Sequence, residues 1–97
     1  MGCKIIFSPQ AIADSAAAVQ FIAQENPEAA VRVGHALLDR VAVLEHFPLI
    51  GADYLKRPGV RKLVSRPYLI FYRFRETENV VDILRYWHGA QKTPPVI

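Results

Sequence analysis

The chain has 97 residues, 52% of them hydrophobic and 22% charged, which is the composition of one small globular domain. A chain of this length is too short for two independent cores, so we predict a single domain over residues 1–97. The sequence has no apolar run of about 18 residues and no secretory leader pattern, so we expect no transmembrane helix and predict a cytoplasmic protein.

Charge is distributed unevenly along the chain. Residues 1–50 contain three basic and five acidic side chains, whereas residues 51–97 contain nine basic and four acidic ones, giving net charges of −2 and +5. A basic half indicates an acidic partner, either nucleic acid or an acidic protein segment. A solvated basic face without a partner is the alternative.

The cysteine and histidine content argues against a metal centre. Cys3 is the only cysteine, so neither an internal disulfide nor a cysteine cluster can form. The three histidines, His35, His46 and His88, are too scattered in the sequence to indicate a metal site. We therefore expect no metal ion and no cofactor.

The first half of the chain predicts a strand followed by a helix. Residues 4–7 are a short apolar run typical of a strand, and Ser8-Pro9 supplies a helix cap and a first-turn proline. A helix is predicted over residues 9–25, with Ile12, Ala16 and Val19 on an apolar stripe. Within it, Asp14 is interpreted as a solvated helix charge.

Asn26-Pro27 repeats the cap-and-proline device and predicts a second helix over residues 27–47. The link between the two helices is so short that they must form an antiparallel hairpin. The apolar stripe of the second helix consists of Ala30, Val33, Leu37, Val41 and Leu44.

The hydrophobic period changes to two after the loop 47–59. Residues 60–64, 68–75 and 80–88 read as three strands joined by short links, which require antiparallel neighbours. Both faces of the middle segment are partly apolar, which is typical of a central strand. Alternation in the last segment is imperfect, so the face that packs on the helices stays open until a bulge can be placed.

These elements define an α+β fold of order β-α-α-β-β-β. The helical hairpin packs on one face of a small, mainly antiparallel sheet, and the other face is left open. That open face is built by the basic half of the chain.

A cluster of polar residues ends the last predicted strand. Arg85, Tyr86 and His88 lie within four residues, and a histidine can exchange a proton near neutral pH. Together with Arg61 as a phosphate ligand they form a candidate catalytic set. The interpretation we favour is structural: Tyr86 or Trp87 packs in the core, and His88 ends the strand by bonding to backbone.

Aromatic and basic residues also alternate along residues 68–75. Tyr68, Tyr72 and Phe74, with Arg73 and Arg75, have the composition of a platform that stacks nucleic-acid bases. Core packing with a charged rim is the interpretation we favour.

Four stretches of the sequence resemble the ParE/RelE superfamily of bacterial toxins from type II toxin–antitoxin modules. The shared features are the NP-x-AA helix start, the FP-x-x-G loop, the PGVR-x-L strand start and the terminal HGA. The resemblance covers nearly the whole chain. The stretches are FSPQAIADSAAAVQFIAQENPEAA, VLEHFPLIG, PGVRKLVSRPYLIFYRF and VVDILRYWHGA.

The RelE-like branch consists of ribosome-dependent mRNA endonucleases. The resemblance implies an arginine after the first tyrosine of the Y-x-x-x-Y strand, where this chain has Leu69. It also implies a basic residue where this chain has Gln91, although Lys92 is one step away. As an RNase, the protein would use the candidate set of the last strand together with the strand-start arginine. That set is His88, Arg85, Arg61 and Tyr86.

The ParE-like branch, which the PGVR, YLIFYR and HGA pieces favour, poisons DNA gyrase by binding. We therefore expect a gyrase-directed toxin, used in plasmid stabilisation, and lean against an enzyme; a degenerate protein that only binds its antitoxin is a further alternative. The implied partner is an acidic antitoxin whose C-terminal segment folds on binding, giving a hetero-oligomer. The expected target- or antitoxin-binding residues are Arg61, Lys62, Arg73 and Arg85.

Overall fold

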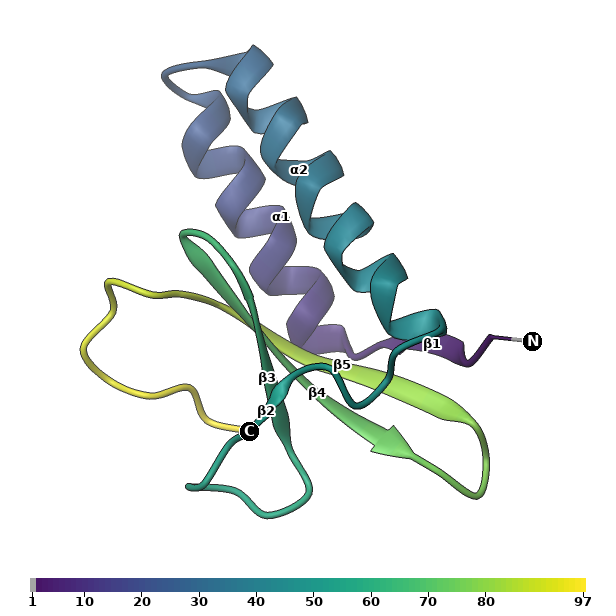
Figure 1. Cartoon of the computed structure of the whole chain (residues 1–97). Coiled ribbons are helices and arrows are strands. Elements are labelled where there is room, and N and C mark those ends of the chain that lie inside the picture. The colour runs from purple at the N-terminus through teal and green to yellow at the C-terminus, as the bar shows by residue number, and fades with distance from the viewer. Residues whose placement is uncertain (1) are drawn as a thin grey trace.

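The computed structural model describes residues 2–97 as a helical hairpin packed on one face of a five-stranded sheet (Figure 1). The predicted α+β class and the order of elements are confirmed. None of the helices in residues 2–97 has the length and apolar character needed to cross a membrane. The elements are β1 (Lys4–Phe7), α1 (Pro9–Ala23), α2 (Pro27–Ala42), the 3₁₀ helix η1 (Val43–Glu45), β2 (Ala52–Asp53), β3 (Arg61–Ser65), β4 (Tyr68–Arg75) and β5 (Val80–His88).

Both helices begin where the cap-and-proline pattern predicts. The Ser8 hydroxyl accepts a hydrogen bond from the Ala11 N–H at 3.0 Å, and the Asn26 side chain accepts one from the Ala29 N–H at 3.0 Å. Each cap satisfies a backbone donor that the first helical turn leaves without a partner. Ser8 also donates to the Leu84 carbonyl of β5 at 2.8 Å, which ties the start of α1 to the sheet.

The second helix ends earlier than the predicted residue 47. Regular α geometry stops at Ala42, and the chain tightens into η1 before leaving the helix. A proline disfavours the α conformation in the residue before it, so Pro48 opposes extension of the helix to Phe47. The first helix likewise ends at Ala23, two residues before its predicted end.

The sheet has the strand order β1-β5-β4-β3-β2, which makes β4 the central strand, as predicted. All neighbouring pairs are antiparallel except β1 and β5, which run parallel. The two-residue β2 was not predicted, because its sequence, Ala52-Asp53, has no strand preference and pairs only through the backbone of β3. The third strand begins at Arg61, one residue later than the predicted start at residue 60.

A β-bulge in β5 explains the imperfect alternation of its sequence. Phe71 pairs with Arg85, but the next residue, Tyr72, pairs with Ile83, so Leu84 is an extra residue in β5. A single inserted residue reverses which side chains face each way.

The bulge decides which side chains of β5 face the helices. Val81 and Ile83 before it, and Tyr86 after it, are all buried in the core beneath the hairpin. Without the extra residue, Tyr86 would point to the open face of the sheet.

The predicted core stripe of α1 is wrong by one position. Ala11 is fully buried, whereas Ile12 is 57% exposed. Ile12 lies about 100° further round the helix than Ala11 and lines the pocket between α1 and α2. The predicted stripe of α2 is confirmed, since its members are buried or pack against the core.

Gly51 lies where the loop after η1 meets the centre of the sheet. Its N–H donates to the Tyr72 hydroxyl at 2.9 Å, and Tyr72 is fully buried. A Cβ at this position would lie 2.7 Å from the Tyr72 ring and 2.9 Å from the Lys62 carbonyl oxygen. Because the neighbours are a buried ring and backbone, neither can move aside.

We therefore expect Gly51→Ala to destabilise the protein by about 1–3 kcal/mol, because overpacking forces buried groups apart. Gly34→Ala is the control, since its Cβ would meet only Val19 Cγ2, at 3.6 Å, inside a helix. That variant should gain up to about 1 kcal/mol through helix propensity. Urea unfolding monitored by circular dichroism measures both, and equal effects of the two changes would contradict the packing argument.

Candidate functional site

The four residues of the candidate catalytic set do not converge. Arg61 aligns with Tyr72 near one end of β4, whereas His88 aligns with Tyr68 at the other end. Four residues of an extended strand separate those positions, or roughly 13 Å along the sheet. A phosphate held by Arg61 would therefore lie out of reach of His88, because proton transfer needs contact at hydrogen-bond distance.

His88 forms the structural contacts that we favoured. Its Nδ1 accepts a hydrogen bond from the Ala90 N–H at 3.0 Å, and its ring packs edge-on against Tyr68 with centroids 5.3 Å apart. The next N–H, of Gly89, donates to the Pro67 carbonyl at 2.7 Å. The predicted bond from His88 to backbone is confirmed, and it closes the end of β5.

Tyr86 is buried between the sheet and the hairpin, as the core interpretation predicted. Only 5% of the residue is exposed, and burial raises the pKa of its phenol to about 12. At neutral pH the phenol therefore keeps its proton, and it is a poor candidate for general acid–base catalysis.

Arg85 forms a two-pronged ion pair with Asp14 of α1. Its Nε and Nη2 donate to the two carboxylate oxygens at 2.7 and 3.0 Å, and the Tyr86 N–H donates to the same carboxylate at 3.1 Å. Both side chains are 18% exposed, so Asp14 is not the solvated charge that was predicted. The hydrogen bond to Asp14 raises the pKa of the Arg85 guanidinium.

The remaining N–H groups of Arg85 reach the tail, residues 89–97. Nη1 donates to the Val96 carbonyl at 2.8 Å, and the guanidinium carbon lies 5.1 Å from the centre of the Trp87 ring. Arg85 thus joins α1, β5 and the tail, and its guanidinium N–H groups bind partners within the chain.

Arg61 is also engaged by its own chain. It donates to the carbonyls of Leu49 and Gly51 at 3.2 and 2.7 Å, and its Nη2 lies 3.6 Å from Asp53. These bonds hold the loop that leads into β2.

By contrast, Lys62 and Arg73 have no ion pair or side-chain hydrogen bond within residues 2–97, so two of the four predicted binding cations are free.

The aromatic residues of β4 do not form a base-stacking platform. Tyr72 is fully buried, and Tyr68 and Phe74 pack against the same core beneath the helices. Arg73 and Arg75 alternate with them and so point to the opposite face. The core-and-rim interpretation is confirmed.

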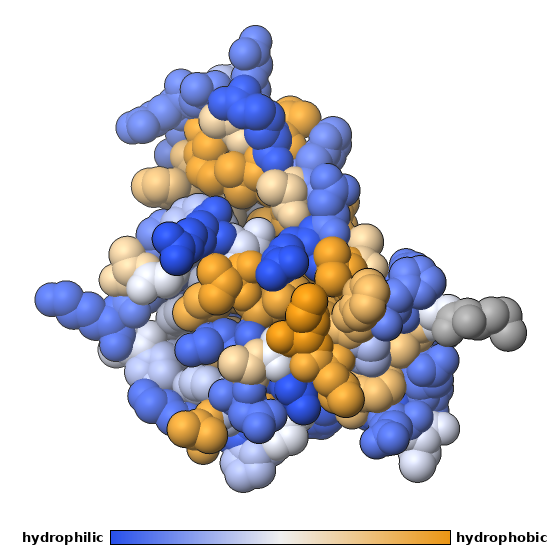
Figure 2. Space-filling model, viewed as in Figure 1, coloured by the Kyte–Doolittle hydropathy of each residue, from blue (hydrophilic) through white to orange (hydrophobic). Residues whose placement is uncertain are grey.

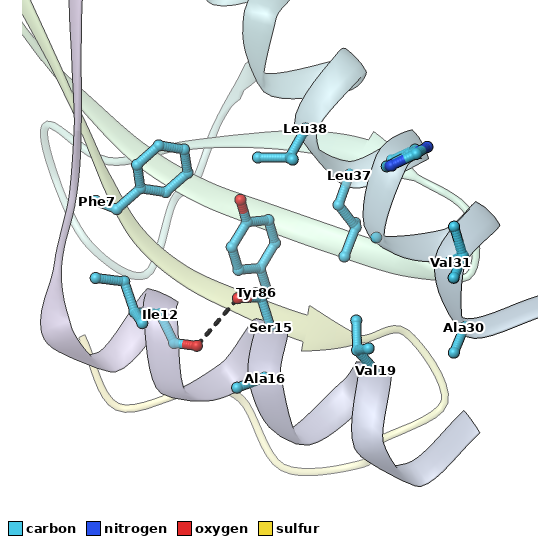
Figure 3. A pocket seen from close by; sticks show the side chains of 12 residues that line it. Phe7, Ile12, Ser15, Ala16, Val19, Ala30, Val31, Leu37, Leu38 and Tyr86 are labelled. Atoms are coloured by element: carbon cyan, nitrogen blue, oxygen red, sulfur yellow. Dashed lines mark hydrogen bonds between the residues drawn. The ribbon is translucent and has the colours of Figure 1, made fainter. Parts of the chain in front are cut away.

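An apolar groove runs between α1 and α2. Its volume is about 530 Å³, and Tyr86 forms part of its floor, with Phe7 beside it (Figure 3). Ile12, Val31 and Leu38 on its walls are 57%, 58% and 57% exposed. The predicted stripe of Ile12, Ala16 and Val19 contained the signal for this groove, because those residues line it instead of the core.

A second apolar surface follows η1. Figure 2 shows hydrophobic side chains gathered at the foot of α2 and over the loop that follows it in the chain. Phe47, Leu49 and Ile50 of this loop are each more than half exposed. Sequence analysis identified the loop by its prolines and glycines but not its exposed apolar side chains.

Comparison with known proteins decides the family. A model described as the ParE toxin of the type II toxin–antitoxin system, parDE, matches residues 5–93. The chain belongs to the ParE toxin family. The ParE-like branch favoured by the sequence is thereby supported, and the protein is a toxin of a type II toxin–antitoxin system.

Three solved structures share the fold of this ParE toxin. The chromosomal ParDE system from P. aeruginosa is 24% identical, with a TM-score of 0.76 over 89% of this chain and 95% of that one. The RelBE2 complex from Mycobacterium tuberculosis is 22% identical, with a TM-score of 0.68 over 91% and 99%. The isolated E. coli RelE toxin is 16% identical, with a TM-score of 0.65 over 93% and 87%. No curated protein sequence matches the chain.

Burial of Tyr86 makes the stability of this ParE toxin sensitive to alkali. A phenol with a pKa near 10 when unfolded and about 12 when folded stabilises the fold fully below pH 10, and this contribution disappears as pH rises through 12. Between pH 9 and pH 11 the native protein should lose about 1 kcal/mol more than Tyr86→Phe loses. Urea unfolding of both proteins at the two pH values gives this difference, and parallel losses would show that Tyr86 ionises freely.

Proposed function

We propose that this toxin poisons DNA gyrase by binding and that a cognate antitoxin neutralises it. The family match supports this proposal. The main structural argument for it is that the residues of the candidate catalytic set are occupied by contacts within the chain. Tyr86 is buried, His88 Nδ1 is bonded to backbone, and the two arginines are bound within the chain. We place the activity in the cytoplasm.

RNA cleavage needs more than these residues provide. Attack by the 2′-oxygen requires a base at that oxygen, cations on the phosphate and an acid at the leaving group, all within hydrogen-bond reach of one position. Leu69 and Gln91 provide neither charge nor a titrating group at the positions where the resemblance implies cations. Binding without bond cleavage is the function that this arrangement supports best.

Expression without antitoxin separates the possible targets. We expect DNA breaks that depend on gyrase and an SOS response, with messenger RNA left intact, and we expect His88→Ala to stay toxic. Primer extension on total RNA and an SOS reporter make the comparison. Codon-positioned RNA cuts that disappear in His88→Ala would assign the RelE-like activity instead. Abundant folded protein without toxicity would assign a protein that only binds its antitoxin.

The groove between the helices is the proposed site of the antitoxin. A C-terminal segment that is disordered alone and folds on binding can lay an apolar helix face into such a groove. The exposed Ile12, Val31 and Leu38 would then be covered. Beyond the groove, we propose that the segment's acidic residues contact Lys62 and Arg73, the two predicted binding residues that form no ion pair within residues 2–97, whereas Arg61 and Arg85 support the surface from within.

Leu38→Glu tests the groove directly. Loss of a covered leucine, together with burial of a carboxylate, should weaken antitoxin binding at least about 100-fold, equivalent to about 3 kcal/mol. Leu55→Glu is the control, because Leu55 is 91% exposed and lies outside the groove. It should change the affinity less than threefold. Calorimetry with the purified antitoxin measures both, and equal losses would place the contact elsewhere.

A further inference from the structure

The tail covers part of the open face of the sheet and borders a second cavity there, which is open to solvent. After β5 it arches away and returns beside β2 and β3 (Figure 1), and the Trp87 indole N–H donates to the Thr93 carbonyl at 3.0 Å. The space between tail and sheet has a volume of about 250 Å³. Pro94 and Pro95 form part of its wall, and their fixed φ angles stiffen the tail at that point.

Three of the four lysines in the chain line this cavity. Lys62 projects from β3, Lys56 from the loop before it, and Lys92 from the tail. No aspartate or glutamate lines the cavity, and within residues 2–97 none of the three lysines has an ion pair or a side-chain hydrogen bond. Three lysines that border one space and have no acidic partner there give it a positive potential, which attracts an anion.

Three aromatic side chains also line the cavity. Phe71 of β4 forms part of the floor beside Lys62, its partner in β3, and Trp87 of β5 lies beside Leu69. Tyr54 packs edge-on against Phe71, with ring centroids 4.9 Å apart. Phe71 is buried, whereas Tyr54 and Trp87 are partly exposed. Partly exposed rings beside lysines suit a ligand with a flat base and a phosphate, because the base can stack on a ring while the phosphate contacts the lysines.

The size of the cavity limits the ligand further. Sites for drug-sized ligands measure about 300–1,000 Å³, so a space of about 250 Å³ suits a ligand no larger than about one nucleotide and is too small for a duplex. Carboxylates of an acidic peptide would satisfy the lysines but not the aromatic floor.

We propose that this cavity binds one nucleotide, either free or as the exposed unit of a single strand. The phosphate contacts Lys56, Lys62 and Lys92, and the base lies against Tyr54 and Trp87. The site lies on the face of the sheet opposite the helical hairpin, and no bond-breaking is assigned to it. Nucleotide binding here goes beyond the proposed action on gyrase. It is tested on the purified toxin without gyrase, so either proposal can fail without the other.

Trp87, the only tryptophan of the chain, reports on the cavity by its fluorescence. The test is to titrate the purified toxin with dAMP, with a five-nucleotide single-stranded DNA, with pyrophosphate and with a pentaglutamate peptide. Both nucleotide ligands should quench the fluorescence in a saturable way. Similar affinities for the two indicate a free nucleotide, and a much higher affinity for the oligonucleotide indicates a strand.

The lysines provide the variants. Lys56→Gln/Lys62→Gln removes two charges from the cavity and should weaken nucleotide binding at least tenfold, whereas Lys4→Gln, which removes one lysine charge outside the cavity, should change it less than twofold. Circular dichroism confirms that each variant is folded. The proposal is overturned if the Lys4 variant binds as weakly as the double variant, if pyrophosphate or pentaglutamate binds as tightly as dAMP, or if no nucleotide ligand binds.

Discussion

The extra residue at Leu84 sets the geometry on which both faces of this toxin depend. By shifting the register of β5 against β4, it keeps Val81 and Ile83 under the helices and still turns Tyr86 toward them. It also brings the Arg85 guanidinium to the edge of the sheet, against Asp14 of α1. A regular strand without the extra residue would place either Val81 and Ile83 or Tyr86 on the open face of the sheet.

The basic residues of this toxin divide by chemistry. Within residues 2–97, five arginines donate side-chain hydrogen bonds to the chain itself, whereas none of the lysines does. A planar guanidinium fork can bridge carbonyls and carboxylates at fixed angles, whereas an ammonium on a flexible stem is a mobile point charge. The net charge of the chain therefore overstates the charge that is free to attract a partner, and three of the four lysines line the cavity beside the tail. These arginines are Arg40, Arg57, Arg61, Arg75 and Arg85.

Most elements of the fold could be predicted from short-range sequence patterns. Capping residues with following prolines located both helix starts, and two-residue alternation located β4 and β5 with their observed ends. The pairings that depend on distant residues were not predictable in this way. Asp14 meets a guanidinium 71 positions further along the chain, and β2 exists only because β3 offers its edge. The exposed groove was missed for a related reason: neighbouring residues of a helix differ by only about 100° of rotation, so the sequence alone did not show that Ala11 and not Ile12 faces the core.

The outer half of the helical hairpin projects beyond the sheet, as Figure 1 shows. Each helix there has only the other helix for support, and one side of that contact is the open groove. Segments with few buried contacts open at the lowest free-energy cost, so this end of the hairpin should exchange its amide hydrogens fastest. In the proposed complex, a segment in the groove adds a third helix-sized layer and slows that exchange. Neutralisation would then also rigidify the toxin, and release of the antitoxin would return a more mobile molecule to its target.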